Sequence, residues 1–551
     1  MNWYIAGCDQ RAIITPREKE YALQAIQLTA SRKAKETIRT STGWYVIDGK
    51  AYFLHANGAI SSEGQTQQYR ATLKENFQRY VLPDPPEGEK HIEAVRASLG
   101  LLEVGDLSVT IPIFGAVYRA PLGNVDFVGH SSGKTNSLKT AVAVVAQQHY
   151  GKDFDSKHPP ANWTSTGNFN QARMHAGKDV FVLLDDFVPR GTHNDQKRQH
   201  MEFDRMVRAV ADGAFRGRLD AKHSDDAVSR GPRGMVWSTG EVVPEGESCQ
   251  SRLVNTPYRP AQSVDPDKLR HLQHDGANGL LSQAMSAYIR YLATHYPDPA
   301  QLFRTVQDRV EELRDSALRQ TKGHLLRTPE NLANIAVGVE FFLRFALDTG
   351  VITKAESQSI WDRMWKTLMA LGEVQTQRQH EEDPVREALR LLKSADDAGQ
   401  LRFGSLDSND ADLLKESELP RSSHDAENFI GWRKDPDSPW LCDPNRLWAI
   451  IQRLFRDQGR TIPKGKTDLL NEMENGGFIT ARDEDRALPT VKRQVGARAG
   501  RIRVIEIPVQ SFDGVEPARP PRDDLIAEEG ALAGTKSHSV PAQWDEVNID
   551  N

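Results

Sequence analysis

The sequence lacks the features of a secreted or membrane protein. It has no run of about 18 apolar residues, so a membrane span is not expected. Its first residues lack the basic-then-apolar order of a signal peptide. The three cysteines, Cys8, Cys249 and Cys442, are far apart and form no C-x-x-C pair, which argues against both a disulfide framework and a structural zinc site. We therefore expect a cytoplasmic protein with no membrane partner.

An excess of positive charge is also missing. The formal net charge is −6, and residues 511–551 hold nine acidic and three basic groups, so residues 1–510 hold 67 of each sign. A nucleic acid could therefore be held only by local basic patches and not by a general field. No metal motif typical of a primase is present, so any priming has to come from a separate primase or replication protein.

Three or four domains are expected, because at about 150 residues per domain a chain of 551 residues is too long for one core. Between residues 107 and 260, short apolar runs alternate with helical stretches, which is typical of a mostly parallel sheet covered by helices. The expected segments are a small N-terminal α+β module (1–85), an α/β core (86–262), a helical domain (263–400), a linker (401–424), a winged-helix-like domain (425–510) and a disordered acidic tail (511–551).

Local signals refine the two outer modules. A helix is expected over residues 16–38, and apolar segments at 43–47 and 51–54 flank Asp48-Gly49, a pair that favours a tight hairpin turn. Near the other end, Asp443-Pro444 is typical of a helix start, a second helix is expected over 464–475, and extended segments are expected at 478–480 and 501–507. Helix, turn, helix and strands in this order resemble a winged helix.

The most informative stretch is 127–135, where a strand-like run opens onto a small-residue loop that ends in Gly133-Lys134-Thr135. In such a loop the backbone N–H groups surround nucleotide phosphates, the lysine reaches the β and γ oxygens, and the hydroxyl binds Mg²⁺. The pattern G-x-x-x-x-G-K-[ST] expects its first glycine at Val128, but here it comes one residue late, at Gly129. The alternative is a surface turn before a helix. The residues expected to contact ATP are Gly129, His130, Ser131, Ser132, Gly133, Lys134, Thr135 and Asn136.

An apolar run over 179–184 ends in Asp185-Asp186. A continuous apolar run suits a central parallel strand, and carboxylates at its end would emerge beside the phosphate loop. We expect Asp185 to bind Mg²⁺ together with Thr135, and Asp186 to orient or deprotonate the attacking water. The alternative is an acidic strand end exposed in a turn.

Two further segments carry candidate catalytic groups. The apolar strand at 234–241 ends in Ser238 and Thr239, either of which could contact the γ-phosphate or the water; both could instead cap the end of the strand. Arg252 precedes another short strand and is a candidate arginine finger, a residue that stabilises transition-state charge in a neighbouring subunit. It could equally be a solvated arginine.

Together, the motifs at 129–135, 162–166, 183–186, 237–241 and 251–253 resemble those of the helicase-like ATPases known as domain of unknown function 927. That family is associated with phage and mobile-element replication and is similar to superfamily 3 and D5-type helicases. The resemblance covers most of the chain, and it implies a P-loop NTPase of the AAA+-like class that forms a ring, which we expect to be hexameric.

Two basic segments could touch DNA. The interval 214–233 matches the place where superfamily 3 helicases carry a basic hairpin, which makes Arg218, Lys222 and His223 candidates; an ordinary solvated loop is the alternative. The interval 488–505 has five cations and no acidic residue, where a wing would lie, although winged helices also bind proteins. Its cations are Lys492, Arg493, Arg498, Arg501 and Arg503.

Two functions fit these sequence features. The first is an ATP- and Mg²⁺-dependent, ring-forming DNA helicase or translocase that acts on single-stranded or forked DNA in phage or mobile-element replication. The second is a nucleotide-dependent switch or loader that binds DNA or a protein partner without unwinding. Small-molecule phosphotransfer is disfavoured, because a metabolite kinase would not need the helical and winged-helix extensions.

Overall fold

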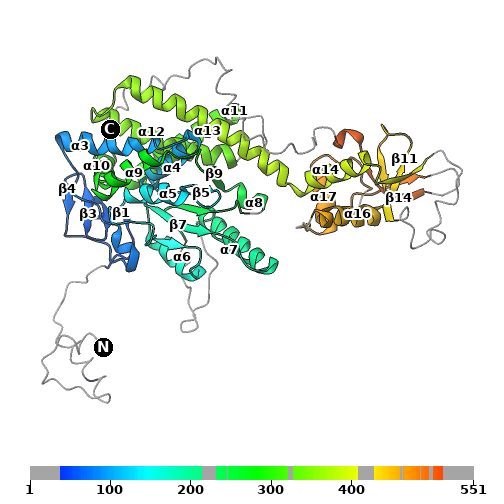
Figure 1. Cartoon of the computed structure of the whole chain (residues 1–551), viewed down its shortest axis with the longest axis horizontal. Helices are drawn as coiled ribbons and strands as arrows, with labels where there is room; N and C mark the ends of the chain where they lie inside the picture. The colour runs from blue at the N-terminus through cyan, green and yellow to red at the C-terminus, as the bar shows by residue number, and fades with distance from the viewer. Residues whose placement is uncertain are drawn as a thin grey trace. The chain divides into compact units, whose positions relative to one another are not determined.

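The computed structural model describes residues 38–213, 231–244, 246–320, 327–406, 427–458, 464–483, 486–495 and 501–512, together with Tyr21 and Ile462 (Figure 1). The chain divides into two compact units, Met1–Thr40 and Ser41–Asn551, and the described sheets belong to the second. Most of the helix expected at 16–38, most of the linker and nearly all of the acidic tail lie outside the described residues.

The first sheet of the second unit is antiparallel, in the order β1-β2-β3-β4. Its strands are β1 (Gly43–Ile47), β2 (Lys50–His55), β3 (Gly58–Ser61) and β4 (Gly64–Thr66). Asp48 and Gly49 join β1 to β2 with φ angles of 51° and 78°. These are the left-handed conformations that a tight hairpin turn requires, so the predicted hairpin is confirmed.

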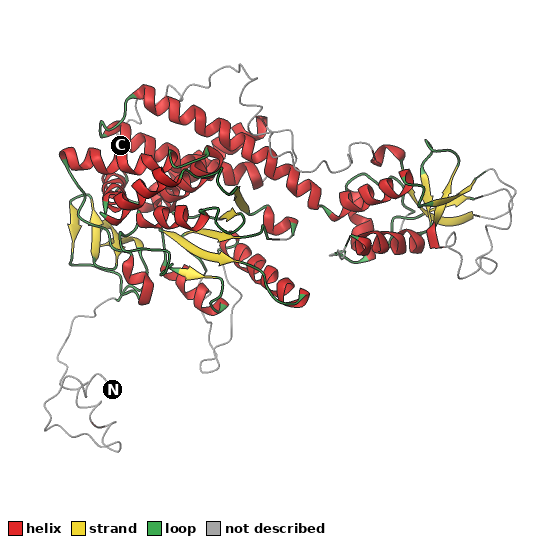
Figure 2. Ribbon diagram, in the orientation of Figure 1, coloured by secondary structure: helices red, strands yellow, loops and turns green. Residues whose placement is uncertain are grey.

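A five-stranded parallel sheet forms the centre of this unit, with helices on both sides of its strands (Figure 2). Its order is β6-β7-β8-β5-β9, so β8 lies between β5 and β7 although it follows both in sequence. The strands are β5 (Val128–Ser132), β6 (Ala161–Asn162), β7 (Phe181–Phe187), β8 (Met235–Gly240) and β9 (Leu253–Pro257). The parallel sheet predicted from the apolar runs is therefore confirmed.

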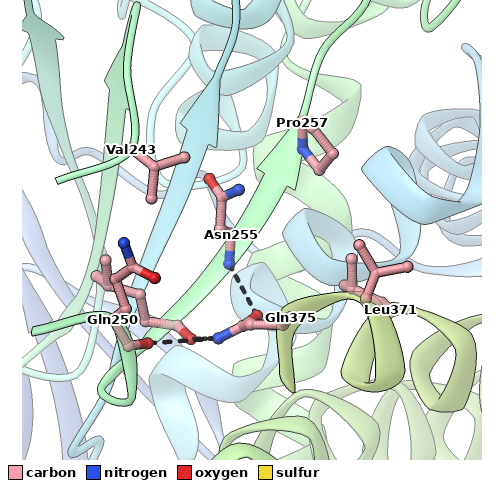
Figure 3. Close-up of a pocket in the computed structure, with 8 residues that line it drawn as sticks. Val243, Gln250, Asn255, Pro257, Leu371 and Gln375 are labelled. Atoms are coloured by element: carbon pink, nitrogen blue, oxygen red, sulfur yellow. Dashed lines mark hydrogen bonds between the residues drawn. The ribbon is translucent and has the colours of Figure 1, made fainter. Parts of the chain in front are cut away.

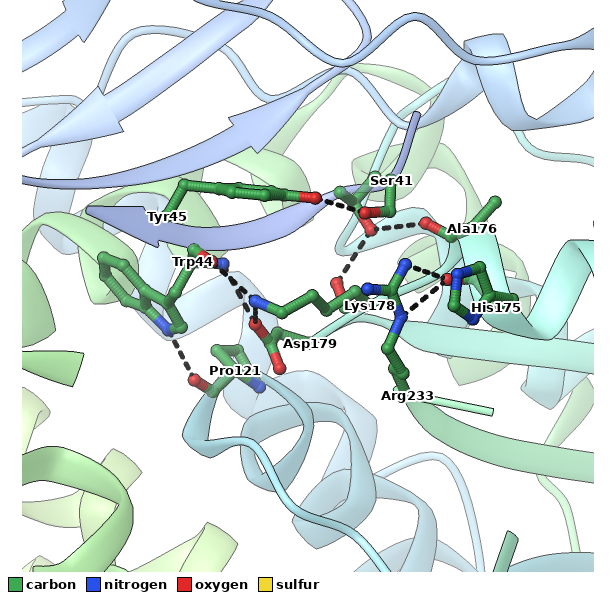
Figure 4. Close-up of polar contacts among 10 residues, drawn as sticks. Ser41, Trp44, Tyr45, Pro121, His175, Ala176, Lys178, Asp179 and Arg233 are labelled. Atoms are coloured by element: carbon green, nitrogen blue, oxygen red, sulfur yellow. Dashed lines mark hydrogen bonds and ion pairs between the residues drawn. The ribbon is translucent and has the colours of Figure 1, made fainter. Parts of the chain in front are cut away.

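The antiparallel sheet is attached to the amino end of β7 by a buried polar cluster (Figure 4). Asp179, at φ 56° and 3% exposed, accepts a hydrogen bond from the backbone N–H of Trp44 at 2.9 Å. Lys178 donates both to Asp179 and to the carbonyl oxygen of Trp44. The Trp44 indole donates to the carbonyl oxygen of Pro121 at 2.7 Å. The two sheets also share one hydrophobic core, so β1 is fixed to the same strand whose far end carries Asp185.

Helices surround the sheet, and the described residues between β9 and residue 397 form further helices and no strand. They are α3 (Gly88–Leu99), α4 (Leu107–Arg119), α5 (Lys139–Gln148), α6 (Gly167–Ala176), α7 (His193–Ala211), α8 (Glu247–Gln250), α9 (Pro266–Ala277), α10 (Leu280–His295), α11 (Pro299–Gln320), α12 (Arg327–Asp348), α13 (Lys354–Glu382) and α14 (Pro384–Asp397). α4 and α12 approach closely, because a Cβ on Gly338 would lie 2.1 Å from the carbonyl oxygen of Gly115. Among the described helices, none is long and apolar enough to cross a membrane.

The outer edge of β9 is covered by a side chain from α13 (Figure 3). The Gln375 amide accepts a hydrogen bond from the Asn255 N–H at 3.3 Å and donates to the carbonyl oxygen of Leu253. It therefore occupies backbone positions that a sixth strand would fill. A small pocket beside it is lined by Val243, Gln250, Leu253, Asn255, Pro257, Leu371, Val374 and Gln375.

The C-terminal module has its own core and a sheet in the order β10-β11-β12-β14-β13. Its elements are β10 (Arg402–Ser405), β11 (Phe429–Arg433), β12 (Trp440–Cys442), α16 (Pro444–Asp457), α17 (Lys466–Asn475), β13 (Val491–Gln494) and β14 (Arg501–Ile507). Asp443 caps α16 by accepting from the N–H groups of Asn445 and Arg446, and Pro444 follows as the first helical residue, as the sequence predicts. The segment 478–480, expected to be extended, forms no strand.

Candidate functional site

Polar side chains gather at the carboxyl edge of the parallel sheet, where β5, β7 and β8 all end. Asp185, near the end of β7, accepts hydrogen bonds from the hydroxyls of Thr140 (3.0 Å) and Thr239. Burial raises the pKa of Asp185, while the two hydroxyl contacts lower it. Within the described residues its side-chain partners are these two hydroxyls, and no cation forms an ion pair with this carboxylate. Its surroundings therefore fit a bound divalent cation, which would supply the missing positive charge.

Asp186 differs from its neighbour in both exposure and backbone conformation. It is exposed, has φ 67°, and lies at a break in the pairing between β7 and β8. Its N–H donates to the Thr239 hydroxyl at 3.1 Å. Aspartate is among the few non-glycine residues that adopt this conformation, and non-glycine residues held in it are concentrated at turns and functional sites. The geometry thus turns one carboxylate of the pair inward and the next one out to solvent.

The two candidate hydroxyls of β8 have different partners. Ser238 is fully buried and accepts a hydrogen bond from the Trp163 indole at 2.9 Å. Thr239 is also buried but contacts both Asp185 and the backbone of Asp186. The structure brings Thr239, and not Ser238, to the acidic pair.

Four of the residues expected in the phosphate loop lie in a strand. β5 runs to Ser132 and pairs with β8 on one side and β9 on the other through all five residues. Gly129 lies in the middle of this strand, where a Cβ would come within 2.0 Å of the Trp237 ring. His130 is buried, its Nε2 lies 2.9 Å from the Val242 carbonyl oxygen, and burial lowers its pKa to about 4. The late glycine is therefore required for packing against Trp237.

The loop itself begins at Gly133, where a Cβ would lie 2.5 Å from the carbonyl oxygen of Tyr258. Lys134, Thr135 and Asn136 are exposed, and the Thr135 hydroxyl donates to the carboxylate of Glu241. Thr135 therefore contacts Glu241, the residue that follows β8, and not Asp185. The loop-side hydroxyl that donates to Asp185 belongs to Thr140.

Lys139 and Thr140 are functional candidates that the sequence reading missed. They are the first two residues of α5, directly after the loop. One signal for them was present: Gly133 is followed after five residues by Lys139-Thr140, which is the spacing of the phosphate-loop pattern. Only the second glycine is replaced, by Leu138.

Arg252 lies at the opposite edge of the sheet. It precedes β9, and its carbonyl oxygen accepts from the N–H of Val128 at the start of β5. Its guanidinium donates to the backbone and the hydroxyl of Ser248, both at 2.7 Å. Burial lowers its pKa, with repulsion from Arg327 and Arg208 acting in the same direction. β9 is five residues long, which separates Arg252 from the carboxyl edge by about 16 Å.

The candidate nucleic-acid contacts are partly described. Arg218, Lys222 and His223 lie outside the described residues, as does Arg498. In the hairpin β13–β14, Arg493 is paired with Glu506 and Arg503 with Asp483, each at 2.7 Å. Lys492 lies directly opposite Arg503, and Arg501 lies opposite Gln494. Within the described residues, Lys492 and Arg501 form no ion pair, so they are the cations of this hairpin whose charge is not locally compensated.

Comparison with known proteins gives a likeness in fold. No protein-family model matches the sequence, and no curated protein matches it. The solved structure of SCCmec type IV Cch, described as an active helicase, is similar over 91% of this chain and 85% of its own, with 12% identity and a TM-score of 0.51. The match to an inhibitor-bound JCV helicase covers 45% of this chain and 65% of the helicase chain at 14% identity. Its TM-score of 0.24 is too low to compare folds. The chain has a helicase-like α/β fold.

Proposed function

We propose that the protein is an ATP-driven motor that assembles as a ring and moves along or unwinds DNA. The observation that carries this proposal is the carboxyl edge of the parallel sheet. There β8 separates the loop strand β5 from the acidic strand β7, and Thr239 of β8 contacts Asp185. The Thr239 hydroxyl therefore lies between Asp185 and the loop after β5, which is proposed to bind the nucleotide. In this position it can respond to the presence of the γ-phosphate.

The residues at this edge have distinct proposed roles. Mg²⁺ held by Asp185 would neutralise charge on the phosphate oxygens of ATP. Thr239 holds the Asp185 carboxylate in place and contacts the backbone of Asp186. Asp186, turned out to solvent at φ 67°, orients the attacking water or accepts its proton.

Arg252 supplies the argument for a ring. It cannot serve the nucleotide of its own subunit, because it lies at the other edge of the sheet, about 16 Å away by the length of β9. We propose that it reaches the site of the adjacent subunit, so that ATP is hydrolysed at the interfaces of a hexamer. The replication of a phage or mobile element as the setting is proposed from the resemblance to domain of unknown function 927.

DNA is the proposed substrate of movement. Arg218, Lys222 and His223, which lie outside the described residues, are proposed as contacts to DNA. Lys492 and Arg501 are proposed to bind phosphates, since their charges are not compensated within the hairpin. Contacts of this kind bind without reading sequence and weaken steeply with salt.

The decisive experiment combines strand displacement on forked DNA, DNA-stimulated ATP hydrolysis and a mass determination. We expect ATP-dependent unwinding by an oligomer, and loss of turnover in Asp185→Asn. Asp308→Asn is the matched control, because this carboxylate is exposed on α11, a helix that contributes no residue to the site. A monomer whose ATP hydrolysis ignores DNA would replace the motor with a nucleotide-dependent switch.

A further inference from the structure

We propose that the phosphates of ATP are held by residues 133–140, with Lys139 as the phosphate-binding lysine and Thr140 as the Mg²⁺-binding hydroxyl, in place of Lys134 and Thr135. This inference rests on the proposed function, because it concerns the same ATP site. It moves the phosphate-binding residues five positions along the chain from those that the Gly-Lys-Thr motif indicates.

The first argument is the path of β5. Gly129, His130, Ser131 and Ser132 are paired with β8 and β9, so their backbone groups belong to the sheet. A phosphate cradle needs free N–H groups that point into a loop. That loop starts at Gly133, which supplies the first glycine of the pattern and has no room for a side chain next to Tyr258. The Gly133 N–H still donates to the carbonyl oxygen of Gly240 at 3.1 Å, so free N–H groups of the loop lie beyond it.

The second argument is the backbone of the loop. Asn136 and Leu138 have φ angles of 68° and 64°, so two loop residues adopt the left-handed conformation before α5 begins. Asparagine tolerates this conformation, and glycine adopts it most easily. Leu138 therefore has the conformation that suits the second glycine of the pattern, although its side chain differs. Leu138 is the one position at which residues 133–140 depart from the pattern in sequence, and at that position the backbone conformation still matches the pattern.

The third argument is the surroundings of the two lysines. Lys139 is the first residue of α5, where the helix N-terminus attracts anions, and its amine lies 3.5 Å from the carbonyl oxygen of Lys134, folded over the loop. Lys134 is exposed. Ser137 within the loop is 3% exposed, and its hydroxyl has no hydrogen-bond partner among the described residues. A buried hydroxyl without a partner is unfavourable, so the loop has a polar group that a phosphate oxygen would satisfy.

The fourth argument is the metal. A Mg²⁺ ion in a phosphate loop is bound by the loop hydroxyl and by the acid of the neighbouring strand, so the two must be close. The hydroxyl of Thr140 lies 3.0 Å from Asp185, whereas that of Thr135 contacts Glu241. The hydroxyl that the metal needs is already beside its carboxylate in Thr140.

The test compares matched variants of the two lysines in the full-length protein. Binding of a fluorescent ATP analogue with Mg²⁺ is measured, together with the rise in unfolding temperature that Mg²⁺ and ATP cause. We expect Lys139→Ala to weaken binding by about 10- to 100-fold, as loss of a charge-assisted contact does. Lys134→Ala should stay within about twofold of the wild type, because exposed side chains outside a contact contribute little. Lys139→Met and the unfolding temperature without nucleotide exclude a folding defect as the cause.

The threonines give a second, independent comparison. Thr140→Val keeps the shape of the side chain and removes the hydroxyl, so it should raise the Mg²⁺ concentration needed for ATP binding, whereas Thr135→Val should not. Greater loss in Lys134→Ala, equal loss in both lysine variants, or loss in neither would overturn the inference while leaving an ATP-binding protein. If the wild type binds no ATP with Mg²⁺, the proposed function itself fails.

Discussion

Substitution of Gly129 tests whether this residue is needed for packing against Trp237 or for binding ATP. In Gly129→Ala the new Cβ would lie 2.0, 2.3 and 2.6 Å from three carbons of the Trp237 ring. Trp237 is fully buried, its indole donates to Ser131 at 3.0 Å, and its ring stacks on Phe181 at 6.1 Å. Neither the ring nor the central strands can therefore move without disturbing other contacts.

The expected result is a stability loss of the size that overpacking causes, about 1–3 kcal/mol. For a folded region of this kind, that loss corresponds to a fall of about 2–4 °C in unfolding temperature per kcal/mol. ATP affinity of the folded fraction should be unchanged, because Gly129 lies within β5 and not in the loop.

A double-mutant cycle with Trp237→Phe checks the cause. The smaller ring should make room for the new methyl group, so the double variant should lose less stability than the sum of the two single variants. Thermal unfolding and binding of a fluorescent ATP analogue are the two assays. Unchanged stability together with weakened ATP binding in Gly129→Ala would refute the packing explanation and return Gly129 to the phosphate loop.

Two further predictions concern Arg252 and a buried histidine. Arg252→Ala should keep ATP binding and lower hydrolysis by about 10³-fold or more. Mixing Arg252→Ala subunits with Asp185→Asn subunits should restore part of the activity, because some interfaces then combine an intact Asp185 with an intact Arg252 from the neighbour. No recovery in mixed rings of verified composition would count against action between subunits. Burial lowers the pKa of His149 to about 4, so the folded state favours the neutral ring. The resulting stability is present above the ordinary pKa of about 6.5 and is lost as the pH falls toward 4, by about 2 kcal/mol at pH 5. His149→Gln should reduce the loss of stability between pH 7 and pH 5, and equal losses in both proteins, measured by denaturant unfolding, would contradict this assignment.

Regular features of the fold could be predicted because local chemistry determines them. The Asp48-Gly49 hairpin follows from the positive φ angles that these residues tolerate. The start of α16 follows from the cap that Asp443 provides. The central strand β7 follows from an apolar run that ends in carboxylates.

The end of β5 could not be predicted in the same way, because three of its residues are polar. His130, Ser131 and Ser132 are buried, and they find internal partners far away in sequence: the Val242 carbonyl oxygen lies beside His130, and the Trp237 indole donates to Ser131. A pattern of apolar residues places the end of the strand at the first polar residue. Tertiary contacts with β8 and β9 extend this strand to Ser132.

The same limit affects the reading of a motif. A Gly-Lys-Thr triplet predicts a phosphate loop only if a strand ends before it and a helix begins at its lysine. Here the strand ends at Ser132 and the helix begins at Lys139, so the structural frame for such a loop is residues 133–140. Leucine in the left-handed conformation costs about 1–2 kcal/mol, and composition alone does not indicate that Leu138 adopts it. Lys134-Thr135 and Lys139-Thr140 each match the phosphate-loop pattern except at one glycine, so the sequence does not choose between them. The contact between Thr140 and Asp185 distinguishes them.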